Sequence, residues 1–192
     1  MAVKHITSPL EGDIIKDLRV GDEIFLSGRI LTARDQMHKY LASGEDLPID
    51  IRGCVVYHCG PVIVKEKGSW HIVAAGPTTS IREEPFEADI IERFQPGAIM
   101  GKGGMGESTL KAMKRHGCVY LNVVGGAALS LAGCIKRVED VYMLEKFGVP
   151  EAMWVLSVEN LPALVSMDAH DRSIHKEIKR LSSKRFHDLI NL

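Results

Sequence analysis

Two apolar segments, each followed at once by a glycine-containing turn, constrain the fold of this chain more than any other feature. Residues 70–75 (WHIVAA) have the apolar character of a buried strand, and residues 98–100 (AIM) have that of the next one. Between them, Pro85 suits the first turn of a helix. Apolar side chains then recur on one helical face, at Phe86, Ile90, Ile91 and Phe94. A strand, a helix and a second strand of this size predict a βαβ unit with parallel strands.

The turns after these two segments hold side chains that suit an anion. Gly76-Pro77 ends the first segment, and three hydroxyls and a guanidinium follow, at Thr78, Thr79, Ser80 and Arg82. The second segment opens into the glycine-rich turn 101–106, which carries Lys102. Parallel strands end at the same edge of a sheet, where open α/β sheets bind ligands, so both turns are expected to line one pocket. The sequence therefore predicts an anion site at this edge.

The rest of the chain predicts a mixed α/β fold in a single domain of residues 1–192. Strands are expected at residues 23–31 (bent at Gly28), 54–58, 62–64, 118–124, 135–144, 152–158 and 163–167. Helices are expected at residues 34–41, 107–116, 127–133 and about 173–192. Thr32 would cap the first of these helices, and Gly117 would end the second. Residues 118–124 would add a third strand to the parallel set.

The turn at residues 101–106 also matches the G-x-G-x-x-G fingerprint of dinucleotide-binding proteins. That fingerprint requires a carboxylate about 20 residues further on. Residues 123–127 (VVGGA) contain none. A P-loop is disfavoured as well, because Gly103 follows Lys102 where Ser or Thr is required. A lysine and backbone N–H groups at the start of a helix still favour anion binding.

Composition excludes some classes of function. Of the 192 residues, 45% are hydrophobic and 26% charged, which is typical of a soluble globular protein. The formal net charge of -1 gives no bulk electrostatic reason to expect binding to nucleic acid or to an acidic membrane surface. No apolar run is long enough to span a bilayer and no secretory signal pattern is present, so a cytoplasmic location is expected.

The cysteines do not have the spacing of a metal site. The chain has four, at Cys54, Cys59, Cys118 and Cys134. They form no C-x-x-C pair and match neither a zinc pattern nor a ferredoxin-type cluster pattern. Buried, reduced thiols are the expected state, and no metal ligand is predicted in this chain.

Four segments together resemble a known family. They read GDEIFLSGRILTARDQMHK (21–39), AAGPTTSIRE (74–83), GAIMGKGGMGE (97–107) and PEAMWVLSVENLPALV (150–165). In this order and spacing they resemble the β subunit of two-subunit class I fumarases and L-tartrate dehydratases. The same unit forms the C-terminal domain of single-chain class I fumarases. The resemblance covers nearly the whole chain.

The resemblance implies an iron–sulfur hydro-lyase that reversibly dehydrates a 2-hydroxy dicarboxylate, with malate to fumarate as the expected reaction. In such enzymes a [4Fe-4S] cluster on the α part binds the substrate through one iron. The β part is a swivelling β/β/α three-layer domain with a partly parallel central sheet. The expected partner is therefore an α subunit that carries the cluster, in a heterotetramer of two α and two β subunits. This chain alone is expected to be inactive.

The resemblance also implies roles for residues at matching positions. Thr78 is expected to remove the substrate C3 proton, and Arg82 to bind a substrate carboxylate. Arg34 and Lys102 are expected to contact carboxylate oxygens. Further substrate-binding positions would be Thr79, Gly101 and Gly103. The side chains expected to orient Arg34 are Asp35 and His38.

The sequence departs from many family members just after the threonine pair. Ile81 stands where a small residue is usual, and Glu84 differs as well. These changes leave open which dicarboxylate the pocket accepts, so an L-tartrate dehydratase β subunit is an alternative. Two further alternatives belong to other classes. One is a stand-alone dicarboxylate-binding module without catalysis, and the other is a nucleotide-binding protein that uses the turn 101–106.

Overall fold

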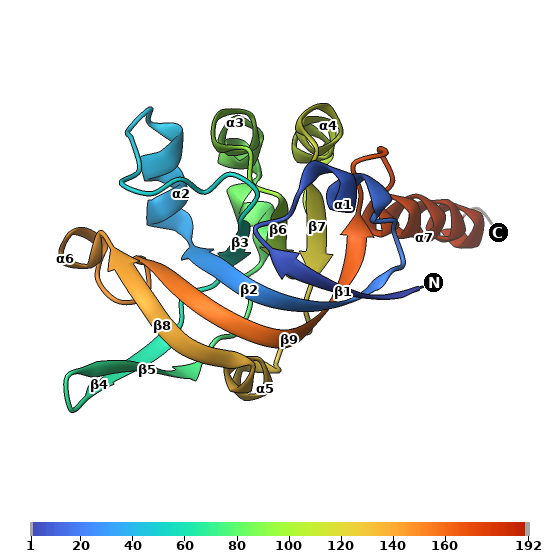
Figure 1. The fold of residues 1–192 in the computed structure, drawn as a ribbon. Coiled ribbons are helices and arrows are strands. Elements are labelled where there is room, and N and C mark those ends of the chain that lie inside the picture. The colour runs from blue at the N-terminus through green and yellow to red at the C-terminus, as the bar shows by residue number, and fades with distance from the viewer. Residues whose placement is uncertain (1, 191–192) are drawn as a thin grey trace.

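A curved mixed sheet organises the fold in the computed structural model, which describes residues 2–190 (Figure 1). In spatial order its strands are β1 (Val3–Ser8), β2 (Glu23–Ala33), β3 (Val55–His58), β6 (Ala98–Gly101), β7 (Val119–Asn122), β9 (Met153–Met167) and β8 (Ile135–Tyr142). The first five are parallel to their neighbours in this order. Strands β9 and β8 add antiparallel pairs. The predicted α/β class with a partly parallel sheet is confirmed.

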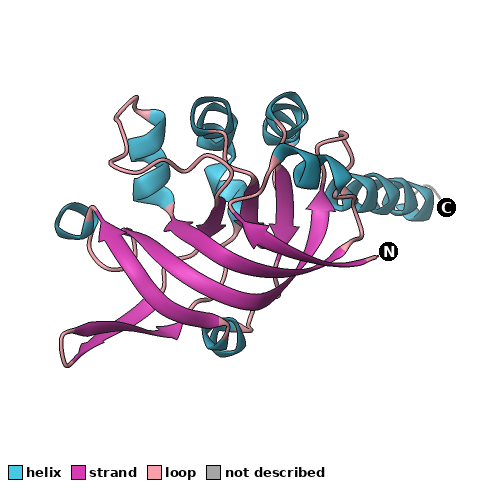
Figure 2. Cartoon of the chain, in the orientation of Figure 1, coloured by secondary structure: helices cyan, strands magenta, loops and turns pink. Residues whose placement is uncertain are grey.

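Strand β9 bends the sheet back on itself, because it pairs with β7, β8 and β2 (Figure 2). Two separate strands were expected here, at residues 152–158 and 163–167, and the structure instead has one strand of 15 residues. Glu159 and Asn160, which interrupt the apolar pattern, lie in a bulge opposite the predicted bend at Gly28. The chain tolerates this interruption since Asn160 and Gly28 both have positive φ, at 50° and 93°.

Three helices cover one face of β3, β6 and β7 (Figure 1). They are α2 (Asp35–Ala42), α3 (Glu84–Phe94) and α4 (Glu107–His116). Alternate strand residues face these helices, and the set comprises Val56, Ile99 and Tyr120. The intervening residues pack in a second core with Trp154 of β9, and they comprise Tyr57, Met100 and Leu121. Burial on both faces explains why these short strands read as continuous apolar runs.

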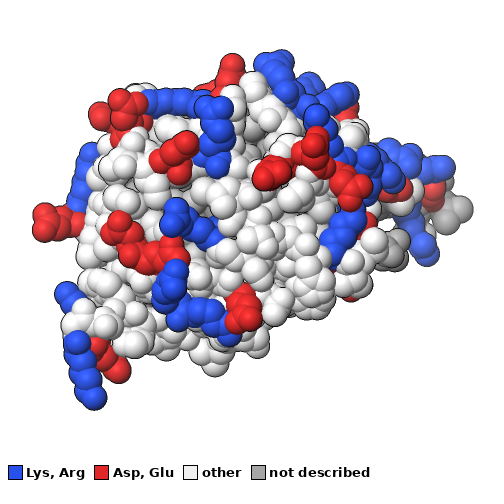
Figure 3. All heavy atoms as spheres, viewed as in Figure 1, with Lys and Arg blue, Asp and Glu red and all other residues white. Residues whose placement is uncertain are grey.

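The remaining helices are short, apart from the last. They are α1 (Gly12–Asp17), η1 (Ser80–Glu83), α5 (Ala128–Gly133), α6 (Leu144–Phe147) and α7 (Ile174–Ile190). The helix predicted at 173–192 is α7, and residues 191–192 lie outside the described residues. It extends from the body with no buried side chain, and basic side chains gather at that end of the molecule (Figure 3). Within residues 2–190, no helix is both long and apolar enough to cross a membrane.

The predicted βαβ unit is wrong in its first strand. Residues 69–74 form β5, which pairs antiparallel with β4 (Val62–Glu66) in a separate two-stranded sheet. The parallel neighbour of β6 is β3. The tight turn at Lys67-Gly68 favours local hairpin pairing, and β5 is consequently only half-buried. After β5 the chain returns to the main sheet, because Cys59 and Pro77 form an antiparallel bridge.

The predicted cap at Thr32 is also wrong, although the helix that it was expected to start is present. Thr32 is a buried residue of β2 whose hydroxyl donates to the Ala152 carbonyl at 3.3 Å and accepts from the Trp154 amide at 3.0 Å. Helix α2 begins two residues further on than a cap at Thr32 would place it, with Arg34 at the N-cap. The predicted end of α4 at Gly117 is confirmed, and Gly117 has a φ of 74°.

Candidate active site

The two predicted turns meet at the carboxyl ends of β3 and β6. Thr79 and Lys102 form a parallel bridge, and the Ser80 amide donates to the Lys102 carbonyl at 3.1 Å. The Thr78 amide and hydroxyl both donate to the His58 carbonyl, at 2.8 and 3.1 Å. Thr78 and Lys102 thus lie on adjacent segments, as expected, even though β5 is not in the sheet. We call this group of turns the sheet-edge site.

Two arginines and two carboxylates flank the sheet-edge site. One Nη of Arg82 lies 2.7 Å from both carboxylate oxygens of Asp35. Arg34 is 3.6 Å from Asp35 and 3.3 Å from Glu151. The sequence predicted that Asp35 orients Arg34, whereas its shortest contacts are with Arg82. The Arg82 side chain is 54% exposed, so solvent weakens this pair and leaves the guanidinium accessible to a ligand.

Glycines let the backbone approach these groups closely. A Cβ atom at Gly60, just after β3, would lie 2.7 Å from the Arg34 side chain, which places Arg34 beside the end of that strand. A Cβ atom at Gly101 would overlap the Ser80 hydroxyl. Gly103 is exposed and has a φ of 83°, a conformation that favours glycine. The predicted substrate-binding glycines therefore have clear conformational or steric roles.

The N-terminus of α4 is already occupied by a carboxylate of the protein itself. Glu84 accepts from the amides of Gly106, Ser108 and Thr109, at 2.6, 3.1 and 3.2 Å. It also accepts from the Thr109 hydroxyl at 2.7 Å. These are the N–H groups that a dinucleotide phosphate would use in a G-x-G-x-x-G site. The prediction that this helix start binds an external anion is therefore wrong, and the nucleotide-binding alternative loses its main support.

Beneath the sheet-edge site lies a buried polar cluster that the sequence did not predict as a unit. Two imidazoles converge on one carboxylate, since Nε2 of His38 and Nε2 of His58 lie 3.2 and 3.1 Å from Glu87 Oε2. All three side chains are fully buried. Glu87 shares a helical face with Ile90 and Ile91, and that spacing was the available signal that its carboxylate points inward.

Each group in this cluster has a shifted pKa. Burial raises the pKa of Glu87, but both imidazoles outweigh that effect and hold it at about 2. Burial lowers the pKa of His38, and the Glu87 carboxylate more than reverses this, so the pKa is raised. For His58 the effect of burial dominates and the pKa is lowered. Glu83, 3.7 Å from His38 Nδ1, has a pKa raised by burial. The cluster therefore holds one buried charge pair, between His38 and Glu87.

The cysteines are free, as expected, but not all are buried. Cys54, Cys59 and Cys118 are buried, whereas Cys134 is half-buried. Burial raises the pKa of Cys59 to about 12, so this thiol stays protonated. Within the described part of the chain, the one group of His, Cys, Asp or Glu side chains with metal-site geometry is the buried cluster of His38, His58 and Glu87. No cysteine belongs to it.

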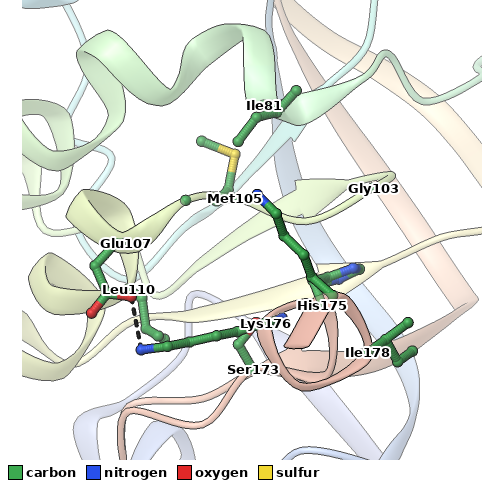
Figure 4. Close-up of a pocket in the computed structure, with 11 residues that line it drawn as sticks. Ile81, Gly103, Met105, Glu107, Leu110, Ser173, His175, Lys176 and Ile178 are labelled. Atoms are coloured by element: carbon green, nitrogen blue, oxygen red, sulfur yellow. Dashed lines mark hydrogen bonds and ion pairs between the residues drawn. The ribbon is translucent and has the colours of Figure 1, made fainter. Parts of the chain in front are cut away.

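A pocket of roughly 520 Å³ adjoins the sheet-edge site, between the glycine-rich turn and α7 (Figure 4). Ile81 and Gly103 line one side, and His175, Lys176 and Ile178 of α7 line the other. An ion pair of 2.8 Å joins Lys176 to Glu107 across it. Of the predicted site residues, only Gly103 lines this pocket. The large side chain of Ile81, one of the unusual residues, is 50% exposed at its edge.

The chain is thus a mixed α/β protein with a cationic and hydroxyl-bearing site at the carboxyl ends of its parallel strands. Residues 3–178 match the fumarase C-terminus family, and the chain belongs to that family. This confirms the resemblance found in the sequence.

Three relatives place the chain within the family. It is 51% identical over 181 residues to a Geobacillus stearothermophilus protein named "Putative fumarate hydratase class I". The matching region covers 94% of this chain but 35% of that relative. It is 43% identical over 183 residues to the "Putative L(+)-tartrate dehydratase subunit beta" of Methanocaldococcus jannaschii, covering 93% and 94% of the two chains. The L(+)-tartrate dehydratase subunit beta of Escherichia coli K12 is 35% identical over 184 residues, with 95% and 91% covered. The chain therefore spans about a third of the first relative and nearly all of the other two.

Proposed function

We propose that this chain is the β subunit of an iron–sulfur hydro-lyase that reversibly dehydrates a 2-hydroxy dicarboxylate, with malate to fumarate as the main reaction. The observation that carries the proposal is the bridge between Thr79 and Lys102. It brings together the backbone segments that carry the Thr79 hydroxyl and the Lys102 ammonium, and the two arginines lie at the start of α2 and in η1. A single chain of this kind supplies the groups that bind and deprotonate a dicarboxylate.

The cations suit a ligand with two carboxylates. Removing a proton next to a carboxylate places extra negative charge on that group in the transition state, and nearby cations lower the barrier. Arg82 and Arg34 offer planar guanidinium groups that can bind a carboxylate in two-pronged fashion. Lys102, one strand away, offers a point charge for the other carboxylate. A substrate carboxylate would compete with Asp35 for Arg82.

Thr78 is the proposed base, and its contacts indicate what its hydroxyl requires in order to accept a proton from the substrate. Its hydroxyl donates to the His58 carbonyl at 3.1 Å, which orients the oxygen and leaves its lone pairs free. A neutral hydroxyl is a weak base in water. To remove the substrate proton, Thr78 must first pass its own proton to a neighbouring group or to solvent, and positive charge would stabilise the resulting alkoxide. Lys102, Arg34 and Arg82 lie on segments that meet at the sheet-edge site and are the cations proposed to supply this charge. Proton removal by Thr78 is thus coupled to the same groups that bind the substrate.

The [4Fe-4S] cluster must come from a partner. Three of the cysteines are buried in the cores, and the cysteines form no metal-binding group with other ligands among residues 2–190. The residues of this chain therefore do not fit the cluster. The Lewis acid that a leaving hydroxide requires would be supplied by the cluster of an α subunit. We further propose a cytoplasmic heterotetramer of two α and two β subunits, in which this chain forms a single swivelling β/β/α three-layer domain.

Reconstitution tests the proposal. The chain is co-expressed with its α subunit without oxygen, and fumarate hydration is followed by the loss of fumarate absorbance. We expect turnover by the complex, and none by the isolated chain or by the isolated α subunit. Turnover by the isolated 192-residue chain would overturn the borrowed-cluster proposal. Dicarboxylate binding without turnover in a cluster-loaded complex would favour the non-catalytic binding module.

An L-tartrate dehydratase subunit is the second candidate. It is favoured by chain length, since the relatives named as tartrate dehydratase β subunits match this chain over 94% and 91% of their own lengths. The higher identity to the relative named as a fumarate hydratase favours malate and fumarate. Comparison of kcat/KM for malate and L-tartrate in the same complex decides between them.

A further inference from the structure

We propose that Glu87 is a positioning residue for the reaction, because it joins a buried hydrogen-bonded network that holds the segments of the sheet-edge site in register. This inference rests on the proposed function for its kinetic consequence. The network itself is a property of the isolated chain and can be tested there. Glu87, His58 and Tyr120 were not expected to take part in the site.

The network begins at the Glu87 carboxylate on α3. Its Oε2 atom lies between Nε2 of His38, from α2, and Nε2 of His58, from the end of β3. The two imidazole rings meet edge to face with centroids 4.8 Å apart. Burying polar groups is costly unless each has a partner. Glu87 Oε2 is hydrogen-bonded to Nε2 of His38, whereas Nε2 of His58 lies 3.1 Å from the same oxygen without the alignment of a hydrogen bond.

The far ends of the two imidazoles contact residues of the site. Nδ1 of His38 lies 3.0 Å from the Arg34 carbonyl, and Nδ1 of His58 lies 2.9 Å from the Ser80 hydroxyl. The hydroxyl of Tyr120, on β7, donates to Ser80 at 2.7 Å. The network thus links α2, α3, β3, β7 and η1 through side chains buried beneath the substrate-facing surface.

With Glu87 ionised, the donors and acceptors favour one proton arrangement for this network. The Arg34 carbonyl can only accept, so Nδ1 of His38 carries a hydrogen. Its Nε2 faces a carboxylate and must carry one as well, which makes His38 an imidazolium. Tyr120 donates to Ser80, which leaves the Ser80 hydroxyl to donate to Nδ1 of His58. The Nε2 of His58 then carries its single hydrogen, 3.1 Å from Glu87 Oε2 although not aligned with it as a hydrogen bond. The result is a charge pair of His38 and Glu87 with a neutral His58, in agreement with the directions of their pKa shifts.

Each end of the network belongs to a residue that carries, or is hydrogen-bonded through its backbone to, a residue that we assign to the reaction. The Arg34 peptide precedes α2 and carries the Arg34 guanidinium. The backbone carbonyl of His58 accepts both hydrogen bonds from Thr78. The Ser80 amide donates to the Lys102 carbonyl. A change at Glu87 therefore displaces the proposed base and two carboxylate-binding cations together, although Glu87 touches none of them.

The charge pair of His38 and Glu87 also fixes the relative positions of α2 and α3 more strictly than apolar packing would. A buried ion pair adds little net stability, because desolvation offsets the attraction. It does require its partners at hydrogen-bonding distance, whereas apolar side chains tolerate sliding. Displacements of about 1 Å can reduce turnover by about a hundredfold, so such a constraint matters at a catalytic edge. The presence of a buried charge pair that adds little stability is consistent with a role in holding the site residues in position.

The kinetic experiment uses Glu87→Gln in the cluster-loaded complex of both subunits. The amide keeps the volume but cannot hold His38 as an imidazolium. We expect kcat to fall at least about tenfold, with KM for malate changed less than about threefold, since the flexible ends of Arg and Lys side chains can still reach the substrate. The matched control is Glu92→Gln, an exposed residue on the same helix, which should have wild-type kinetics. Ser80→Ala, which removes one hydroxyl at the far end, should lower kcat in the same sense.

A second measurement does not depend on activity or on the folding of any variant. Nitrogen-15 NMR of the isolated wild-type chain should show His38 protonated on both ring nitrogens at pH 7.5 and His58 as a neutral Nε2–H tautomer. If the wild-type complex has no hydratase activity, the proposed function fails while this spectrum still tests the network. Normal kcat in a folded Glu87→Gln or Ser80→Ala complex would overturn the positioning role. A neutral His38, or one equivalent of zinc retained by the purified chain, would overturn the proton arrangement.

Discussion

Glu84 offers the sharpest test of the structure, because its carboxylate caps α4 from another helix. Glu84→Ala removes one acceptor for three backbone amides and for the Thr109 hydroxyl. Loss of an N-cap costs about 0.5–2 kcal/mol. Thr109 is fully buried, and a buried hydroxyl left without a partner costs about 1–3 kcal/mol. Allowing for overlap between the two effects, we expect the free energy of unfolding to fall by about 2–4 kcal/mol.

Urea denaturation of the isolated chain, followed by circular dichroism, measures this loss. The matched control is Glu107→Gln, since Glu107 is in the first turn of the same helix but pairs with Lys176 at the surface. Its loss should cost less than about 1 kcal/mol. The melting temperature of Glu84→Ala should drop by roughly 4–16 °C for a chain of this size. A loss no larger than that of Glu107→Gln would refute the assignment of Glu84 as the cap.

Four further predictions concern the sheet-edge site and the cluster below it. Thr78→Ala should abolish turnover in the complex and leave malate binding, measured by calorimetry, nearly unchanged; near-normal turnover would remove its role as the base. Arg82→Lys should lower kcat/KM by at least about tenfold, because an ammonium cannot replace the planar fork, and a smaller loss would argue against carboxylate binding there. Gly101→Ala should destabilise the chain by about 1–3 kcal/mol, as its Cβ would overlap Ser80, whereas Gly125→Ala, whose Cβ would meet only the flexible Lys102 at 3.3 Å, should not. Glu87 has a folded-state pKa of about 2 against an ordinary value of 4.5, so its contribution to stability should be complete above pH 4.5 and be lost as the pH falls toward 2. The acid-induced loss should therefore be shallower in Glu87→Gln, and equal pH dependence in the two proteins would contradict the buried ionised carboxylate.

The sequence predicted the type of most helices and strands, because their periodicity and end signals are local. Helix α4, for example, has amphipathic spacing and ends at a glycine with positive φ. The partner of a strand is not a local property. Residues 69–74 have the apolar character of a sheet strand, and the polar residues before them indicate a hairpin turn. Their character does not show that the hairpin with β4 forms a sheet of its own. The predicted convergence of Thr78 and Lys102 still holds, since the bridge of Cys59 and Pro77 returns the chain to the end of β3.

The site was predictable in its exposed groups and not in its buried ones. The hydroxyls and cations come directly after strands in the sequence, so their position at the edge of the sheet could be predicted from the sequence. No role was predicted for Glu84 or Glu87, and each binds groups from another element. A carboxylate on the apolar face of an amphipathic helix indicates burial, but its partners come from distant positions such as His38 and His58. Such pairings depend on tertiary packing that one sequence does not reveal.

The contact between Arg82 and Asp35 means that a cation of the sheet-edge site is already paired with a carboxylate of the protein itself. A tethered carboxylate competes at an effective concentration in the millimolar range, whereas a free anion must arrive from solution. Acetate or chloride offers a single contact in exchange for the one it displaces. Under the proposed function, a guest with two carboxylates would engage Lys102 as well, and such a guest would gain from the exchange. Discrimination against small anions is then set by a side chain of the protein itself, before any chemistry begins.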